Sequence, residues 1–370
     1  MSEQLEQGMT YAGTGINYKE MDPFKRKALG RALRTRRNLE RLGFKVVEES
    51  YGESAIVIDV GPFYLVVVEE GLGTKNLVAE AMEEISGEAC HGLVAQCNFA
   101  MASNDLSTVG ATPFLAMLHL AVGNAKWLAD KERTDALVDG YGDACDEAGC
   151  TWGGGETPTL RDIVNPSSAV FANCCIGAIM DKDNLLLGSR IEHGDAIILV
   201  ESSGIHANGL TLARDIRAKL PEGYAAKLPS GRKYGEVLLD PTIIYAPLVD
   251  ACAHLLHYAV NITGHGWRKL MRAKQNFTYV VEKLPEVPEI FRFMQEHGPV
   301  DDREAYGNLN MGAGFALYAS PRHADEIVQI AQGLGLKALT AGYVFESERR
   351  QVVIGPLDNL TYDEEELKVR

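Results

Sequence analysis

The chain has 370 residues, with 36 Lys or Arg against 51 Asp or Glu, so its formal net charge at pH 7 is −15. Its length is that of two or three domains, and its 46% apolar residues argue against a largely disordered chain. The acidic balance argues against a protein that coats nucleic acid or an anionic membrane, because phosphate backbones require a basic footprint. A small phosphorylated ligand held by a local site remains compatible with it.

No stretch has the roughly 20 apolar residues of a membrane span, and the N-terminus lacks the basic start and apolar middle of a signal peptide. The seven cysteines are too scattered for a disulfide framework and form no CxxC pair, which argues against a zinc site. These features predict a cytoplasmic protein with reduced thiols and without nucleic-acid or membrane partners.

The N-terminal part of the chain predicts an irregular start and a basic helix, followed by strands that pair early. Apolar residues recur every three to four positions over 24–42, beside eight Lys or Arg residues between positions 25 and 41. This block is either a solvated helix face or a positive wall near an anionic ligand. The pattern then predicts strands at 54–60 and 63–68, helices at 75–86 and 91–109, a strand at 113–122, a helix at 127–148 and a strand at 168–180.

The pattern starts again after Asp181, which predicts a domain boundary at 181–194. The second part predicts strands at 195–201, 276–282, 312–319, 338–345 and 350–354, and helices at 208–219, 241–258 and 321–334. The segment 220–240, rich in Gly and Pro, predicts a surface loop. The chain is therefore expected to be an α/β (α+β) protein with an N-terminal segment (1–50), a first domain (51–185) and a second domain (186–360).

Six clusters combine glycines, hydroxyls, amides and carboxylates where predicted strands and helices meet. Each one alone is compatible with a plain turn or helix end. Together they predict a groove for a nucleotide and a second phosphorylated ligand, because glycine lets backbone N–H groups approach a phosphate closely. The clusters lie at 69–75, 103–106, 152–158, 201–209, 261–267 and 310–314.

Individual residues in these clusters have the chemistry of phosphate and metal binding. Lys75 can pair with a phosphate, and Glu70 and Asp105 offer the hard oxygen ligands that Mg²⁺ prefers. A nucleophilic pair of Ser203 and His206 is disfavoured, since no GxSxG elbow is present. The absence of GxGxxG likewise gives little support to a dinucleotide-binding Rossmann domain.

The sequences of the motifs and their order along the chain resemble those of one family over residues 18 to 354. This family is that of the aminoimidazole ribonucleotide synthetases, or phosphoribosylformylglycinamidine cyclo-ligases, of the PurM-like superfamily. The matching segments are Tyr18-Lys19-Glu20, the Gly-Leu-Gly-Thr-Lys of 71–75, Asn104-Asp105-Leu106, the Gly-Gly-Glu-Thr of 154–157, 202–209, 240–245, 262–264 and 310–314.

The resemblance implies a two-domain PurM-like fold in which the N-terminal domain contributes strands to an intersubunit β-barrel, and therefore a homodimer. It implies a ligase of purine biosynthesis that converts formylglycinamidine ribonucleotide and ATP into aminoimidazole ribonucleotide, ADP and phosphate. ATP would phosphorylate the formamide oxygen, and the amidine nitrogen would attack the resulting iminophosphate. The implied cofactors are ATP and Mg²⁺.

The resemblance also implies roles for individual residues. The implied catalytic residues are Lys75, Asn104, Asp105 and His206. The implied residues for ATP and its phosphates are Lys19, Gly71, Gly73, Thr74, Lys75, Gly154, Gly155 and Thr157. The implied residues for the second substrate are Ser203, Gly204, His206, Asn208, Thr263, Gly264, Asn310 and Gly312. The implied metal ligands are Glu70, Asp105 and Glu156.

Four features depart from the family's pattern. Glu70 stands where the family usually has Asp, the stretch 158–162 is atypical, His265 interrupts a glycine run, and the glycine-rich segment that normally precedes the first strands is missing. The substrate could therefore differ while ATP binding persists. Two alternatives stay open, namely another PurM-like phosphoryl-transfer enzyme such as a thiamine-phosphate kinase, and a catalytically silent nucleotide-binding regulatory protein.

Overall fold

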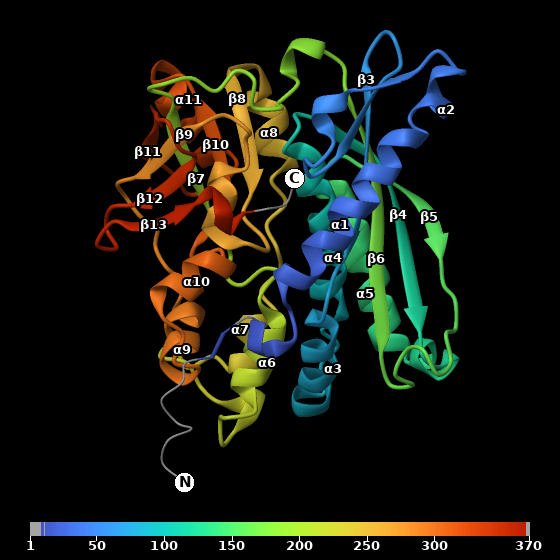
Figure 1. Ribbon diagram of the computed structural model, residues 1–370. Helices are drawn as coiled ribbons and strands as arrows, with labels where there is room; N and C mark the ends of the chain where they lie inside the picture. The colour runs from blue at the N-terminus through green and yellow to red at the C-terminus, as the bar shows by residue number, and fades with distance from the viewer. Residues whose placement is uncertain (1–8, 11, 368–370) are drawn as a thin grey trace.

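The computed structural model describes residues 9, 10 and 12–367, and it contains two α/β units that lie side by side (Figure 1). The N-terminal unit is drawn in blue to green, and the C-terminal unit in yellow to red. Each unit is built on one β-sheet. Among the described residues, no helix has both the length and the apolarity needed to cross a membrane.

The N-terminal unit has a six-stranded sheet in the order β1-β2-β3-β6-β4-β5. Its neighbours are antiparallel except for β4 and β5, which are parallel. The strands are β1 (Lys45–Val46), β2 (Ile56–Asp59), β3 (Tyr64–Gly71), β4 (Thr112–Val122), β5 (Thr151–Glu156) and β6 (Ala169–Ile179). The helices α3 (Lys75–Ser86), α4 (His91–Ser107) and α5 (Lys131–Glu147) belong to the same unit.

The two faces of this sheet differ. On the helix side, Asn173 of β6 accepts a hydrogen bond from the Tyr141 hydroxyl of α5 and donates one to the Phe99 carbonyl of α4. On the opposite face, Met117 and Val170 remain 42% and 50% exposed. The sheet of a single chain is open, so a barrel shared with a second chain stays a prediction.

The C-terminal unit has a seven-stranded sheet in the order β13-β12-β9-β11-β7-β10-β8, in which only β9 and β12 pair in parallel. The strands are β7 (Ala196–Glu201), β8 (Leu256–Asn261), β9 (Phe277–Val281), β10 (Ala313–Ala319), β11 (Ala338–Glu346), β12 (Gln351–Ile354) and β13 (Leu360–Asp363). The helices are α6 (Leu210–Arg217), α7 (Tyr234–Leu238), α8 (Ala246–Cys252), α9 (Glu289–His297), α10 (Asp302–Asn308) and α11 (Pro321–Gly333). Side chains of α8 and α11 form an apolar core with alternate residues of β7 and β10.

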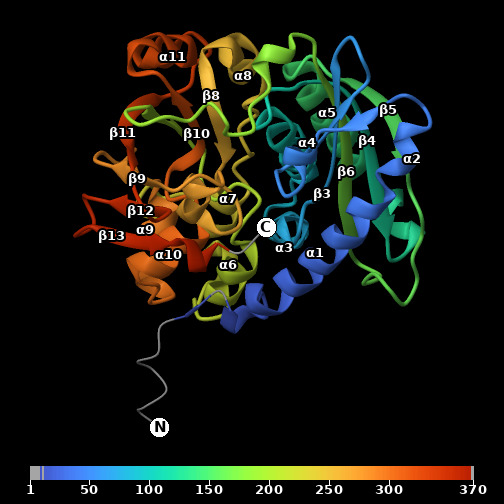
Figure 2. The same cartoon turned by 45° about the horizontal axis from the view of Figure 1, so that its top comes forward.

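The predicted basic helix is shorter than expected and begins earlier. Helix α1 spans Tyr18–Ala32, and a 3-10 turn then separates it from the short helix α2 (Arg37–Glu40). The Asn17 side chain caps α1 by accepting a hydrogen bond from the Lys19 amide. Helix α1 begins near the C-terminal unit and runs along the N-terminal unit (Figures 1 and 2). It is exposed along most of its length; Phe24, for example, is 74% exposed.

The predicted helix over 241–258 is wrong. Residues 241–245 are irregular, α8 covers only Ala246–Cys252, and β8 begins at Leu256. Pro247 lies in the first turn of α8, where a missing N–H is tolerated. Strand β8 is buried on both faces, and a continuous apolar run of this length satisfies helical and strand patterns alike.

Two other expectations are corrected by burial and pairing. The segment 220–240 is not a surface loop: it includes α7, and Tyr234 and Leu238 are completely buried. The glycines of 153–155 do not follow a strand but lie within β5, beside β4. A Cβ on Gly155 would come within 1.7 Å of the Leu118 carbonyl oxygen, so this close approach of the two strands requires glycine.

Candidate functional site between the two units

Two acidic side chains meet where the N-terminal unit faces the C-terminal unit. Glu70 lies near the end of β3, and Asp105 lies in the last turn of α4 with only 6% of its surface exposed. Burial, and after it the neighbouring charge of Asp105, raise the pKa of Glu70 to about 8. The negative charge of Asp105 thus acts on Glu70, and a cation beside the two groups would offset it.

The C-terminal unit places an amide and an ammonium group against this acidic pair. Asn261, the last residue of β8, donates a 2.7 Å hydrogen bond from Nδ2 to Oδ1 of Asp105. The Nζ of Lys269 donates to the carbonyl of Asn261 at 3.2 Å and to Oγ1 of Thr263. We call these four residues, together with Glu70, the carboxylate–lysine cluster: Glu70, Asp105, Asn261, Thr263 and Lys269.

Lys269 is held in this cluster from a short 3-10 helix, Gly266–Met271, and is 8% exposed. Burial lowers the pKa of Lys269 to about 8, whereas the charges of Asp105 and Glu70 act in the opposite direction. Arg272, which follows the same 3-10 helix, approaches Oε2 of Glu53 at 3.4 Å and donates to the Gly52 carbonyl at 3.0 Å. The turn before β2 is thereby tied to the C-terminal unit beside the cluster.

Lys75, a predicted catalytic and phosphate-binding residue, joins the two units. It lies at the start of α3 and is completely buried. Its Nζ donates to the carbonyls of His206 (2.9 Å) and Asp240 (2.7 Å), which both belong to the C-terminal unit. These two bonds use two of the three ammonium protons. A contact between Lys75 and a phosphate stays a prediction.

Asn104, the neighbour of Asp105, attaches α4 to the irregular segment that precedes α8. Its Nδ2 donates to the Ile243 carbonyl at 2.8 Å, and its Oδ1 accepts from the Tyr245 amide at 2.7 Å. Asn104 is 1% exposed. In this arrangement the side chain has a partner on both of its ends, so the structure gives it a clear positioning role and leaves its predicted catalytic role untested.

The predicted second-substrate residues of 203–209 and 310–312 are brought together by Asn310. Its Nδ2 donates to the Gly204 carbonyl at 2.8 Å, and its Oδ1 accepts from Oγ of Ser202 at 2.8 Å and from the Gly312 amide at 3.1 Å. Ser203 donates through Oγ to the Pro241 carbonyl at 2.5 Å. Asn208 lies further along the same loop, where its Nδ2 contacts Sδ of Met101 at 3.8 Å.

His206 lies within this loop and is 2% exposed. Burial, and after it the nearby Lys75 charge, lower its pKa to about 3, so the imidazole is neutral at pH 7. Its Nε2 accepts a hydrogen bond from the Ser203 amide at 3.2 Å. Such a histidine can accept a hydrogen bond but does not supply a proton at neutral pH.

Residues Gly71, Gly73 and Thr74 form the turn between β3 and α3, and Gly264 follows Thr263 of the carboxylate–lysine cluster. A helix N-terminus such as that of α3 favours a bound anion. Gly154, Gly155 and Glu156 lie in β5, and Thr157 follows it, at the edge of the sheet. Glu70 and Glu156 are three strands apart, or ~14 Å at the usual strand spacing. A contact between Glu156 and a metal stays a prediction.

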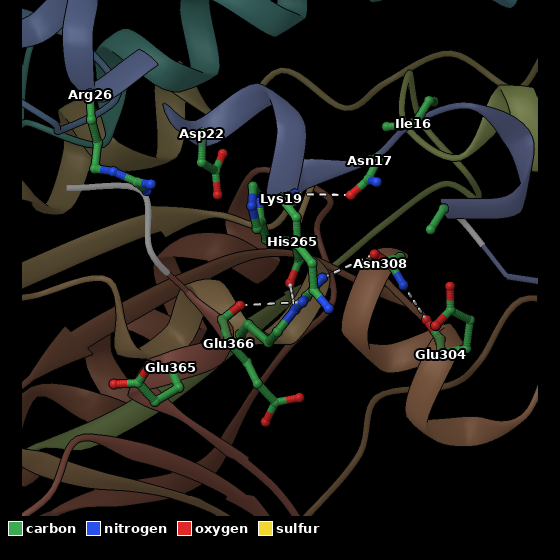
Figure 3. Close-up of a pocket in the computed structure, with 12 residues that line it drawn as sticks. Ile16, Asn17, Lys19, Asp22, Arg26, His265, Glu304, Asn308, Glu365 and Glu366 are labelled. Atoms are coloured by element: carbon green, nitrogen blue, oxygen red, sulfur yellow. Dashed lines mark hydrogen bonds between the residues drawn. The ribbon is translucent and has the colours of Figure 1, made fainter. Parts of the chain in front are cut away.

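Lys19 lines a cavity of about 580 Å³ between α1 and the C-terminal unit (Figure 3). Asp22 and Arg26 of α1 line one side, and His265 lines another. Arg268 also lines the cavity. Burial and the charges of Arg268, Lys269 and Lys25 lower the pKa of His265 to about 3. The cavity therefore adjoins the carboxylate–lysine cluster, and part of the basic helix faces the site while the rest is solvated.

A second group of possible metal ligands lies away from this site. Glu192, Asp195 and His257 bring ligand atoms within 4.8 Å of one another at the start of β7, whereas Ser202 follows the end of that strand. Oδ2 of Asp195 already accepts from the Glu192 amide at 3.0 Å and pairs with Nδ1 of His257 at 2.8 Å. These hydrogen bonds explain why the three side chains lie together: they stabilise the turn before β7.

The acidic pair has the donor set of a magnesium site. Mg²⁺ binds through one or two carboxylates together with phosphate oxygens and water, and Glu70 and Asp105 supply the carboxylates. The raised pKa of Glu70 shows that a positive charge beside this pair would be favourable. These two residues therefore fit the metal that the resemblance implies.

Sequence reasoning missed Lys269 and Arg272 and did not connect Asn261 with Asp105. Both basic residues follow a Thr-Gly turn in a chain with a net charge of −15, which is the one sequence signal that could have drawn attention to them. A lysine is usually exposed, so its burial next to carboxylates could be recognised only from the structure.

Comparisons with known proteins agree on one family. Models of AIR synthase related proteins match residues 52–177 with the N-terminal domain and residues 192–355 with the C-terminal domain. The phosphoribosylformylglycinamidine cyclo-ligase of Methanococcus maripaludis strain C6 is 30% identical over 337 residues, which cover 90% of this chain and 93% of that protein. The protein of the same name from Methanocaldococcus jannaschii is 32% identical over 295 residues, covering 78% and 81%.

The fold also resembles solved structures of low sequence identity. AaThiL complexed with AMPPCP and TMP is 15% identical, with a TM-score of 0.59 and coverage of 92% of this chain and 95% of that one. This similarity concerns the fold alone.

Proposed function

We propose, from the premise that the chain belongs to the AIR synthase related family, that it is the cyclo-ligase of de novo purine biosynthesis. Its relatives in the family are ligases. The proposed reaction converts formylglycinamidine ribonucleotide and ATP into aminoimidazole ribonucleotide, ADP and phosphate in the cytoplasm. The observation that carries the proposal is the acidic pair Glu70 and Asp105 of the N-terminal unit, in which Asn261 of the C-terminal unit donates a hydrogen bond to Asp105.

The chemistry requires an oxygen to be turned into a leaving group. The formamide oxygen attacks the γ-phosphorus of ATP, ADP leaves, and the carbon then carries a phosphorylated oxygen. The amidine nitrogen attacks this carbon and closes the ring, and phosphate leaves with the former formamide oxygen. Phosphoryl transfer depends mainly on positioning and on neutralising charge, so it suits a site made of carboxylates, a fixed cation and backbone N–H groups.

Glu70 and Asp105 would hold Mg²⁺, which neutralises phosphate charge when it is bound. Asn261 keeps the Asp105 carboxylate in place through its 2.7 Å hydrogen bond, and Asn104 keeps α4 against the segment that leads to Tyr245. The turn of Gly71, Gly73 and Thr74 would receive phosphate oxygens at the N-terminus of α3. ATP use is supported by the AMPPCP complex of the similar fold, since AMPPCP is an ATP analogue.

The second substrate would bind along the cavity and the loops beside the acidic pair. Lys19 would meet a phosphate from the α1 side of the cavity, while Thr263 and Gly264 would contact the substrate from the C-terminal side. Ser203, Gly204, His206, Asn208, Asn310 and Gly312 form the adjoining loops. Because His206 is neutral, its proposed contribution is to orient a group and not to protonate it.

The active form is proposed to be a homodimer. The open face of the six-stranded sheet exposes Met117 and Val170, and apolar sheet faces are normally covered. Glu156 lies ~14 Å from Glu70 within one chain, so it would reach a metal only if a second chain brought it there. Closure of the two sheets into one barrel would cover the open face.

Turnover by the purified protein tests the proposal. With ATP, Mg²⁺ and formylglycinamidine ribonucleotide, aminoimidazole ribonucleotide should form and be detected colorimetrically. Asp105→Asn should lower kcat by roughly 10²-fold or more, because a charge that acts in the transition state is removed, while the circular dichroism spectrum stays unchanged. Absence of the product with the wild-type protein would reject the cyclo-ligase, and near-normal turnover of the variant would reject the role of Asp105.

A further inference from the structure

We propose that Lys269 is a resident cation of the acidic site, which weakens the binding of divalent metal by Glu70 and Asp105. The inference rests on the proposed function for its meaning in catalysis, but metal binding itself can be measured without any substrate. The Lys269 ammonium group then supplies part of the positive charge that balances the carboxylates. The charge balance of the site therefore depends less on bound metal than it would with carboxylates alone.

The position of the ammonium group is fixed by its neighbours. Nζ donates to the carbonyl of Asn261 at 3.2 Å and to Oγ1 of Thr263. The side-chain amide of the same Asn261 donates to Asp105 at 2.7 Å. Asn261 therefore connects the lysine with the carboxylate, and these hydrogen bonds keep the ammonium group from moving into solvent.

Burial makes this charge effective. Lys269 is 8% exposed, and Asp105 is 6% exposed, so little water lies between the charged groups to screen them. An unpaired buried ammonium group would be costly, and the carboxylates of Asp105 and Glu70 are the opposite charges that act on Lys269. Its hydrogen bonds to Asn261 and Thr263 hold this positive charge near the carboxylates, where it reduces their attraction for a metal ion.

Two other basic side chains act on Lys269 but are bound elsewhere. Arg272 is engaged by Glu53 and by the Gly52 carbonyl. Lys25 comes from the exposed helix α1, where it lies 3.8 Å from the Asp22 carboxylate. Lys269 is thus the basic residue whose hydrogen bonds lie inside the carboxylate–lysine cluster.

Removing the charge of Lys269 should strengthen metal binding. The experiment uses the full chain without nucleotide and follows Mn²⁺ binding by the electron paramagnetic resonance signal of free Mn²⁺. Lys269→Met should bind Mn²⁺ about tenfold or more tightly than the wild type, because a dication no longer meets a positive charge at close range. Lys269→Arg keeps the charge and should stay within about threefold of the wild type.

The controls separate this effect from damage to the fold. Lys274→Met removes a charge from an exposed lysine in the same part of the chain and should leave Mn²⁺ affinity unchanged. If thermal denaturation shows that Lys269→Met is unfolded, Lys269→Gln retains N–H donors for both acceptors and provides the same comparison. Equal or weaker Mn²⁺ binding by the folded neutral variant would overturn the proposal.

The result is independent of the proposed reaction. A protein that fails to make aminoimidazole ribonucleotide can still show the change in Mn²⁺ affinity, and an active cyclo-ligase can fail to show it. In an active enzyme, a second readout follows: the Mg²⁺ concentration for half-maximal rate should fall in Lys269→Met, even where kcat falls as well. A purely structural role for Lys269 would lower kcat without changing that concentration.

Discussion

Replacing Asn104 with alanine should destabilise the protein by a magnitude that the structure sets. The side chain is buried and satisfies two backbone groups, the Ile243 carbonyl at 2.8 Å and the Tyr245 amide at 2.7 Å. Alanine leaves the buried Tyr245 amide and the half-buried Ile243 carbonyl without these bonds. A buried unsatisfied polar group costs roughly 1–3 kcal/mol, so Asn104→Ala should lower the free energy of unfolding by about 2–5 kcal/mol.

Urea denaturation of wild type and variant, followed by tryptophan fluorescence and circular dichroism together, measures this difference. Asn276→Ala is the matched control, because Asn276 is exposed and makes one hydrogen bond, to the Glu348 carbonyl at 3.1 Å. The control should change the free energy of unfolding by less than about 0.5 kcal/mol. A loss below about 0.5 kcal/mol for Asn104→Ala itself would refute the reasoning that Asn104 fixes the segment 243–245 to α4.

Two further predictions concern the junction of the units. Lys75→Met removes both charge-assisted hydrogen bonds to the carbonyls of His206 and Asp240. In urea titrations it should lower the free energy of unfolding by about 3–6 kcal/mol. A loss equal to that of the control variant Lys274→Met would contradict the role of Lys75. His206 has a pKa of about 3 in the folded protein against an ordinary value of 6.5, so below pH 6.5 the unfolded chain takes up a proton that the folded protein does not. Stability from this group is complete above pH 6.5 and falls as the pH drops toward 3. Between pH 6 and pH 5 the wild type should lose about 1.2 kcal/mol more than His206→Gln. Parallel pH dependences of the two proteins would show that His206 is not buried in its neutral form.

Regular alternation and clear end signals allowed several elements to be predicted from sequence. Strand β7 and helix α11 agree with the sequence prediction to within one residue at each end, because strong apolar periodicity is bounded by turn residues. Strand β8 could not be predicted in this way, since its neighbours across the sheet decide its conformation. Strand β5 was missed because three of its six residues are glycine, which is normally unfavourable in strands.

The candidate site was predictable in part. The residues Glu70 and Asp105 have the chemistry of metal ligands, and the structure brings them together with Thr263. The sequence does not reveal which polar residues are already satisfied by the fold. Lys75 and Asn104 bind backbone groups across the junction, whereas Lys269, an ordinary lysine by sequence, becomes part of the acidic site through tertiary packing alone.

Transfer of an isotope label from substrate to phosphate tests the proposed function most directly. The substrate is formylglycinamidine ribonucleotide with ¹⁸O in its formyl group, incubated with ATP, Mg²⁺ and the wild-type protein. Because the formamide oxygen is phosphorylated and then leaves, each aminoimidazole ribonucleotide formed should be accompanied by one phosphate that contains ¹⁸O, measured by mass spectrometry. Formation of the product with unlabelled phosphate, or hydrolysis of ATP without the product, would contradict the proposed reaction.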